Sequence, residues 1–183
     1  MEDKAGVWLL AFLRPREFVT SIYDINLHHH YERGLRSILT DLDNTLVEWN
    51  SPVATPKLMA WLEDAKTIGF QVCIISNNEE TRVMEFAKLV GIPAVYKAGK
   101  PRKRAYRKTM AMLSTTPRET MMVGDQIFTD VLGGNRLGLY TILVKPIHQQ
   151  EFIGTKVTRK LERLVLRQMP EPTINKVNEK SER

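Results

Sequence analysis

Short apolar runs alternate with amphipathic segments along the chain from about residue 36 onward. Five runs rich in apolar and β-branched residues predict strands at 37–40, 71–75, 94–96, 120–123 and 140–144. Apolar positions at helical spacing predict helices over 55–68, 79–90, 103–113 and 130–137. Runs without polar alternation are typical of strands buried on both faces of a parallel sheet. The pattern therefore predicts an α/β fold, a doubly wound, Rossmann-like parallel sheet flanked by helices.

The two ends of the chain differ from this centre. We expect residues 1–35 to form a helical appendage, packed on the core or lying at a membrane surface, and residues 36–150 to form the core domain. Residues 151–183 are expected to form a basic helix followed by a polar, proline-containing tail of disordered composition. Three adjacent histidines, His28 to His30, are expected on the surface, because neighbouring helix positions do not share one face.

Composition narrows the class of protein. The net charge of +6 favours anionic partners, such as phosphorylated substrates or acidic lipid surfaces. One cysteine, Cys73, lies in an apolar run and is expected to be buried and inert. No apolar stretch approaches the ~20 residues that span a bilayer, and the segment 7–13 lacks a cleavage site. We expect a cytoplasmic protein, with peripheral contact at the inner membrane face as an open alternative.

Polar side chains follow the predicted strands, at the point where each strand ends. Asp41 and Asp43 follow the first strand, Ser76 the second, Lys100 the third and Asp125 the fourth. The carboxyl ends of parallel strands open onto one crevice, so these five side chains should converge although they are far apart in sequence. Each feature alone is commonly structural, as a cap, a turn or a surface lysine. The ordered set is what indicates an active site.

The chemistry of these residue types points to phosphoryl transfer. Of two nearby carboxylates, one can attack phosphorus while the other protonates the leaving oxygen. Asp41 and Asp43 repel each other unless a cation intervenes, which implies a hard divalent metal with Asp125 as a further ligand. Lys100 would offset negative charge, and Ser76 would donate a hydrogen bond to a phosphoryl oxygen.

Four segments together resemble the motifs of the haloacid dehalogenase (HAD) superfamily of phosphohydrolases: 41–45 (DLDNT), 76–77 (SN), 100–101 (KP) and 124–130 (GDQIFTD). More narrowly, residues 15–150 resemble the YqeG-like type IIIA branch, which is related to phosphatidylglycerophosphate phosphatases. The resemblance implies that Asp41 is the nucleophile, forms an aspartyl-phosphate and binds Mg²⁺. It implies that Asp43 acts as general acid and then base, with its backbone carbonyl on the metal.

The resemblance also assigns the remaining site residues. Ser76 and the amide of Asn77 would hold the phosphoryl group, and Lys100 would pair with the nucleophile and the phosphate. Asp125 would bind Mg²⁺, with Asp130 at the metal directly or through water. The expected activity is Mg²⁺-dependent hydrolysis of a phosphate monoester.

Sequence spacing restricts the substrate. HAD enzymes can carry cap domains between these motifs, but the intervals Asp43–Ser76 and Ser76–Lys100 are too short for one, so we expect a capless, open site. An open site suits a substrate at a surface, and phosphatidylglycerophosphate is the favoured one. The alternatives are a soluble sugar or nucleotide phosphatase, or a non-catalytic basic protein that binds RNA or an acidic partner, although no nucleic-acid motif is present.

Two further features indicate contact with an anionic membrane. The stretch 97–108 contains seven basic residues and no acidic one, and segment 7–13 is apolar and followed by Arg14 and Arg16. A solvated helix face and a helix packed on the core are the respective alternatives.

Overall fold

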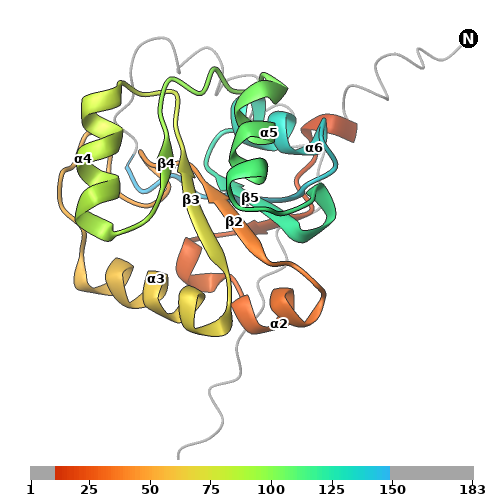
Figure 1. The fold of residues 1–183 in the computed structure, drawn as a ribbon, viewed down its shortest axis with the longest axis horizontal. Coiled ribbons are helices and arrows are strands. Elements are labelled where there is room, and N and C mark those ends of the chain that lie inside the picture. Colours follow the sequence, from red (N-terminus) through yellow and green to blue (C-terminus); the bar gives the residue numbers. More distant parts are fainter. Residues whose placement is uncertain (1–10, 149–183) are drawn as a thin grey trace, which may run out of the picture.

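The computed structural model describes residues 11–148, which form one parallel sheet with helices on both faces (Figure 1). The six strands are hydrogen-bonded in the order β1-β6-β5-β2-β3-β4, and every pairing is parallel. The strands are β1 (Glu17–Val19), β2 (Ser37–Thr40), β3 (Gln71–Ile75), β4 (Ala94–Val95), β5 (Thr120–Gly124) and β6 (Tyr140–Val144). The predicted fold class is confirmed.

The helices connect successive strands. They are α2 (Leu27–Glu32), α3 (Pro56–Ile68), α4 (Glu80–Val90), α5 (Lys103–Met112) and α6 (Leu132–Asn135). Three shorter turns are η1 (Ile22–Asp24), η2 (Pro117–Glu119) and the π-helical η3 (Ile127–Val131). Thr55 caps α3 by accepting a hydrogen bond from the Leu58 amide at 3.2 Å, and Gly69 ends the helix with φ 113°. Both ends are those that the sequence predicts.

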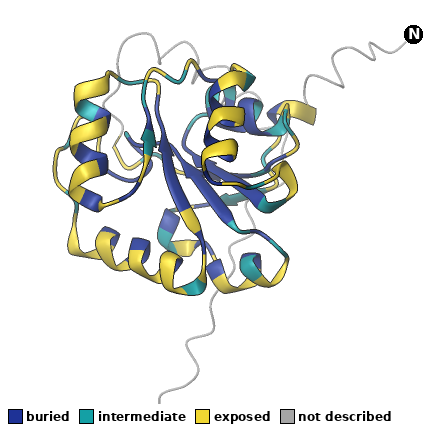
Figure 2. Cartoon of the chain, viewed as in Figure 1, coloured by how far each residue is buried: buried dark blue, intermediate teal, exposed yellow. Residues whose placement is uncertain are grey.

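Successive strand residues face opposite layers, which explains why the strands read as unbroken apolar runs (Figure 2). In β2, Ile38 packs into the larger cluster with residues of α3 and α4, whereas Leu39 packs into a second cluster with residues of α5. Cys73 is buried in that second cluster, as expected. A smaller third cluster joins Leu13 to η3 and β6.

The structure corrects three expectations from the sequence. Residues 17–19 form the edge strand β1 rather than part of a helical appendage, because they pair with 142–144 of β6. His30 is buried, and its Nε2 lies 2.9 Å from the Glu17 carboxylate, whereas His28 and His29 are exposed. The helix expected over 130–137 is instead η3 followed by the short α6.

The expectations for residues 1–10 and 149–183, including the C-terminal helix and tail, lie outside the described residues. Of the apolar segment 7–13, the described part includes Leu13, which packs on the core, and Phe12, which is exposed. No helix within residues 11–148 has the length and apolarity needed to cross a bilayer.

The strand order changes direction at one point in the sheet, which lies between the neighbouring strands β2 and β5. From β2 the chain proceeds outward through β3 to β4, and β5 then begins the other half next to β2. Ligands in such sheets bind at the carboxyl ends of the strands beside this switch point. The segments on either side of Ser76 contain only α3 with β3 and α4 with β4, so no cap domain is built into residues 11–148 at this edge.

Candidate active site

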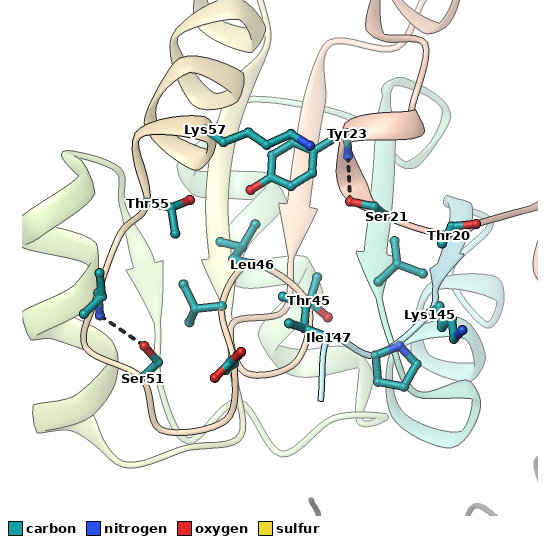
Figure 3. A pocket seen from close by; sticks show the side chains of 15 residues that line it. Thr20, Ser21, Tyr23, Thr45, Leu46, Ser51, Thr55, Lys57, Lys145 and Ile147 are labelled. Atoms are coloured by element: carbon teal, nitrogen blue, oxygen red, sulfur yellow. Dashed lines mark hydrogen bonds between the residues drawn. The ribbon is translucent and has the colours of Figure 1, made fainter. Parts of the chain in front are cut away.

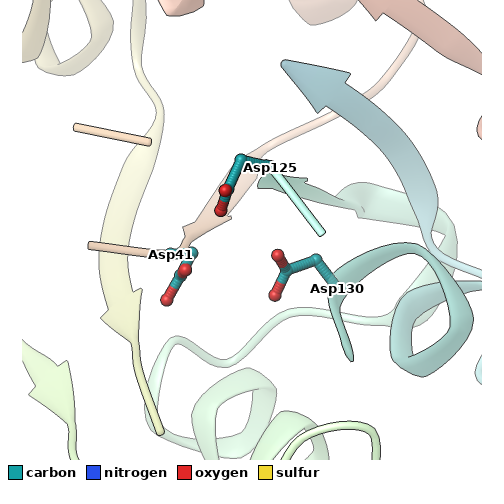
Figure 4. Close-up of side chains that lie close together, drawn as sticks. All are labelled: Asp41, Asp125 and Asp130. Carbon is teal, nitrogen blue, oxygen red and sulfur yellow. The ribbon is translucent and has the colours of Figure 1, made fainter. Parts of the chain in front are cut away.

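The loops that leave β2 and β5 bring three buried aspartates together at the switch point (Figure 4). Asp41 directly follows β2, Asp125 directly follows β5, and Asp130 lies in η3. One carboxylate oxygen from each lies within 4.8 Å of the others. The Asp41 amide donates to the Val123 carbonyl at 2.9 Å, which fixes the first residue of the loop after β2 to the neighbouring strand.

Lys100 is buried between two of these acids. Its Nζ donates to Asp41 Oδ1 and to Asp130 Oδ1, both at 2.7 Å, although 59 and 30 residues separate the partners in sequence. Transfer of an ammonium from water into a protein interior costs on the order of several kcal/mol. The two carboxylates offset this cost for Lys100. Of the five side chains predicted to converge, Asp41, Lys100 and Asp125 lie together, and Asp130 joins them.

The electrostatics of this cluster raise two pKa values. Burial raises the pKa of Asp41 to about 6, with Lys100 opposing the shift and Asp130 adding to it. Burial disfavours the charged form of Lys100, but the carboxylates of Asp130 and Asp41 outweigh it and raise the pKa of the ammonium. Lys100 is therefore a fixed positive charge, and Asp41 remains ionised at neutral pH.

The donor set of the cluster fits a hard divalent cation. Three carboxylates offer oxygen ligands, which Mg²⁺ prefers, and no sulfur or imidazole accompanies them among the described residues. The Asp125 carboxylate also accepts a hydrogen bond from Thr45 Oγ1 at 3.3 Å, which orients it.

A glycine makes room for Asp130. A side chain at Gly124 would overlap the Asp130 carboxylate, so only glycine allows β5 to pass this close. The carboxylate is further fixed by the Gln126 amide, which donates to Asp130 Oδ2 at 3.1 Å. In the Gly124-Asp125 pair of the sequence motif, Asp125 therefore supplies one carboxylate and Gly124 leaves room for the carboxylate of Asp130.

Asp43 lies outside the acidic cluster, with its side chain held by three donors. Arg82 and the Asn50 amide donate to Oδ1 at 3.0 and 2.9 Å, and Asn78 Nδ2 donates to Oδ2 at 2.9 Å. Arg82 also donates to the Ser51 carbonyl at 2.6 Å, so it joins α4 to the loop after Asp43. These contacts hold the side chain in one position at the edge of the site.

Ser76 and Asn77 complete the loop at the end of β3. Ser76 is buried, and its Oγ accepts a hydrogen bond from the Asn78 amide at 3.2 Å. The Asn77 side chain brackets the backbone of Lys100, with Oδ1 accepting from the Lys100 amide at 2.7 Å and Nδ2 donating to its carbonyl at 3.3 Å. Asn77 therefore positions Lys100.

Sequence reasoning missed Thr45 and Arg82. Thr45 carries a signal in hindsight, because it lies in the same loop as Asp41 and four residues after it. Arg82 carries none, since a single arginine on an amphipathic helix is typical of a solvated face.

Comparison with known proteins identifies the family. Residues 97–147 match the family model for HAD-hydrolase-like proteins. The chain is 44% identical over 158 residues to "Probable phosphatase YqeG" of Bacillus subtilis, covering 86% of this chain and 92% of that protein. It is 28% identical over 168 residues to "Phosphatidylglycerophosphate phosphatase 1, chloroplastic/mitochondrial" of Arabidopsis thaliana, covering 85% of this chain and 48% of that protein.

Solved structures share the fold. A chain of Listeria monocytogenes superposes with a TM-score of 0.51 at 19% identity, covering 73% of this chain and 99% of that one. A Legionella pneumophila protein assigned to HAD subfamily III A superposes with a TM-score of 0.50 at 18% identity, covering 79% of this chain and 89% of that one. The protein is a HAD-type phosphatase, and the chain belongs to the family of the Bacillus YqeG phosphatase.

Proposed function

We propose that the protein hydrolyses a phosphate monoester through an aspartyl-phosphate on Asp41, with Mg²⁺ as cofactor and phosphatidylglycerophosphate as favoured substrate. The observation that carries the proposal is the buried cluster in which Lys100 joins Asp41 to Asp130, with Asp125 within reach. A structural ion pair has no need of three converging carboxylates with a single ammonium.

In the first half-reaction, an Asp41 carboxylate oxygen attacks phosphorus. The bond between phosphorus and the ester oxygen breaks, and the leaving alkoxide takes a proton from Asp43. For this step the Asp43 side chain must be protonated and leave its partners Arg82 and Asn78. The third donor is the backbone amide of Asn50, so it is the Asp43 side chain that must rotate away.

In the second half-reaction, Asp43 removes a proton from water and the water oxygen attacks phosphorus. The bond between phosphorus and the Asp41 oxygen breaks, which releases inorganic phosphate and regenerates the carboxylate. Ser76 and the Asn77 amide hold the phosphoryl oxygens, and the Lys100 ammonium stabilises their charge.

Asp41, Asp125, Asp130 and the Asp43 carbonyl are the ligands we assign to Mg²⁺. When bound, the cation supplies electrostatic stabilisation of the transferred phosphoryl group. The acidic cluster supports this assignment by its oxygen-only donor set.

Two observations support a lipid substrate. The Arabidopsis relative is named as a phosphatidylglycerophosphate phosphatase, and the capless edge of the sheet leaves space for a head group presented at a bilayer. The basic net charge adds attraction for an anionic surface.

The test is phosphate release from a panel of phosphorylated lipids, sugars and nucleotides, with Mg²⁺ and with a chelator. We expect phosphatidylglycerophosphate to give the highest kcat/KM and the chelator to abolish turnover. A sugar or nucleotide phosphate preferred over the lipid would reassign the substrate, and full activity in the chelator would overturn the metal mechanism.

A further inference from the structure

A pocket of about 550 Å³ opens at the carboxyl edge of the sheet (Figure 3). Four segments form its walls: the chain after β1, the loop after β2, the start of α3 and the chain after β6. The loop after β2 is the one that carries Asp41 and Asp43. The pocket therefore shares a wall with the proposed site.

Thr45 connects the pocket to the acidic cluster. It lines the pocket, and its Oγ1 donates to Asp125 at 3.3 Å. Thr45 therefore places one wall of the pocket beside an acid of the proposed metal site.

Two lysines from different walls line the pocket. Lys57 comes from the first turn of α3, and its Nζ lies 4.1 Å from the centre of the Tyr23 ring. Lys145 directly follows β6. Neither ammonium forms an ion pair within residues 11–148, and Glu48 is the one acid on these walls. The excess of positive charge fits an anion.

Apolar side chains share the rest of the lining with serine and threonine hydroxyls. Leu46, Val47 and Val144 are buried along it, while Val53 and Ile147 are exposed, at 61% and 48%. Carbon atoms that link two charged groups would pack on such a surface. The combination of apolar lining and two lysines fits an alcohol that carries an anion of its own.

We propose that this pocket binds the leaving alcohol of the substrate, and that Lys57 and Lys145 bind a phosphodiester on that alcohol. The inference rests on the proposed phosphatase function and adds the residues that would select the substrate: two lysines that recognise a phosphomonoester joined through a few carbon atoms to a phosphodiester. That chemistry is present in a phospholipid head group and in its deacylated, water-soluble form.

The kinetic test compares three phosphomonoesters: phosphatidylglycerophosphate in detergent micelles, its deacylated form, and p-nitrophenyl phosphate, which has no second anion. For each variant, the measured quantity is kcat/KM on a diester-containing substrate divided by kcat/KM on p-nitrophenyl phosphate. We expect Lys57→Gln and Lys145→Gln to lower this ratio about tenfold each, through KM, as for a hydrogen bond to a charged group. The Lys→Arg variants should recover most of the loss.

The matched control is Lys66→Gln, which makes the same charge change on the exposed face of the same helix, outside the pocket. It should leave the ratio unchanged. An unchanged ratio in the two pocket variants would overturn the proposal. So would a loss confined to the micellar lipid, because it would assign the lysines to the bilayer surface instead of the diester.

A binding experiment without turnover tests the pocket independently of the proposed phosphatase activity. Glycerophosphoglycerol contains the diester but no phosphomonoester, and it can be titrated into ¹⁵N-labelled protein by NMR. We expect amide shifts at residues 20–23, 45–48 and 145–147, and a Kd at least tenfold weaker in the double Lys→Gln variant. If no phosphomonoester is hydrolysed, the proposed function fails, and this titration still decides whether the pocket binds the diester.

Discussion

At the scale of single residues, the Asp41–Lys100 contact supports the proposal that Asp41 is the nucleophile. Asp41 is held by the ammonium at 2.7 Å and by the β5 backbone through its amide. It is thus fixed in position, while burial makes its charge costly. A buried carboxylate with a raised pKa and a specific charged partner is typical of a functional site, and it contributes little to stability.

Asp41→Asn is predicted to lower phosphate release by at least about 10³-fold, because the amide has the same shape but is a poor nucleophile. The thermal midpoint should stay equal or rise slightly, since a buried carboxylate no longer opposes folding. Asp64→Asn makes the same change on the exposed surface of α3 and should affect neither quantity. Substantial residual turnover in Asp41→Asn would contradict the assignment of the nucleophile.

Asp43→Asn is predicted to slow the first phosphoryl transfer for some leaving groups and not for others. An alkyl alkoxide needs the proton of the general acid, so its transfer should slow by about 10²- to 10⁴-fold. The p-nitrophenolate ion leaves without a proton, so the variant should release a rapid burst of one p-nitrophenol per enzyme before slow turnover. Stopped-flow absorbance measures the burst. Equal slowing of the first turnover for both leaving groups would exclude the general-acid role.

At the scale of elements, a buried pair fastens the edge strand β1 to the rest of the sheet. Glu17 of β1 accepts hydrogen bonds from His30 of α2 at 2.9 Å and from Tyr140 of β6 at 3.3 Å. Burial raises the pKa of the Glu17 carboxyl, but His30 and Tyr140 outweigh it, so the pKa lies below the ordinary 4.5. The ionised carboxylate thus stabilises the fold.

Glu17→Gln is predicted to reduce the free energy of unfolding by about 1–2 kcal/mol near neutral pH, the range for hydrogen bonds to a charged group. Because the folded-state pKa is lowered, the stabilisation is present above pH 4.5 and is lost as pH falls through the folded-state value. Urea unfolding of both proteins at pH 7 and at pH 3.5 measures the difference, with the exposed Glu63→Gln as control. A difference that does not shrink in acid would contradict this account.

The elements that the sequence predicts well are those buried on both faces. β2 and β5 are apolar throughout because helices cover both sides, so their ends, and with them Asp41 and Asp125, can be located. β1 has only Val19 buried and gives no apolar run. Its pairing depends on β6, more than 120 residues away, and no local pattern reports it. The same applies to His30, whose partner Glu17 belongs to that strand, and to Arg82, whose partner Asp43 is 39 residues away.

At the scale of the whole molecule, the basic stretch 97–108 contributes fewer free charges than the sequence suggests. Lys100 is buried in the site, and Lys97 pairs with Glu79 at 2.7 Å. The other exposed members are Arg102, Arg104, Arg107 and Lys108, at the start of α5 and along it. Each basic residue near an acidic bilayer contributes about 1 kcal/mol to the free energy of membrane binding.

We predict binding to anionic but not to neutral vesicles, driven jointly by these α5 charges and by the N-terminal apolar segment. Binding should weaken steeply with salt, since the Debye length falls from ~10 Å at 0.1 M to ~3 Å at 1 M. Co-sedimentation should compare the full chain, a chain without residues 1–10, and a variant with Arg104, Arg107 and Lys108 changed to Gln. The deletion ends at residue 10 because Leu13 is part of the core.

The matched control for the charge variant changes Lys66, Lys88 and Arg118 to Gln, which removes the same number of exposed charges from other elements. Equal recovery in the supernatant with anionic and neutral vesicles would exclude membrane recruitment and favour a water-soluble phosphate ester.

The two outer strands of the sheet are its shortest. β4 contains two residues and β1 three, whereas the inner strands contain four or five. Polymerisation of sheet proteins begins where a long outer strand offers a row of unpaired backbone groups to the next molecule. Within residues 11–148 each outer strand offers only a few such groups. Dense crowding of this protein on a surface should therefore not convert neighbouring molecules into a continuous sheet.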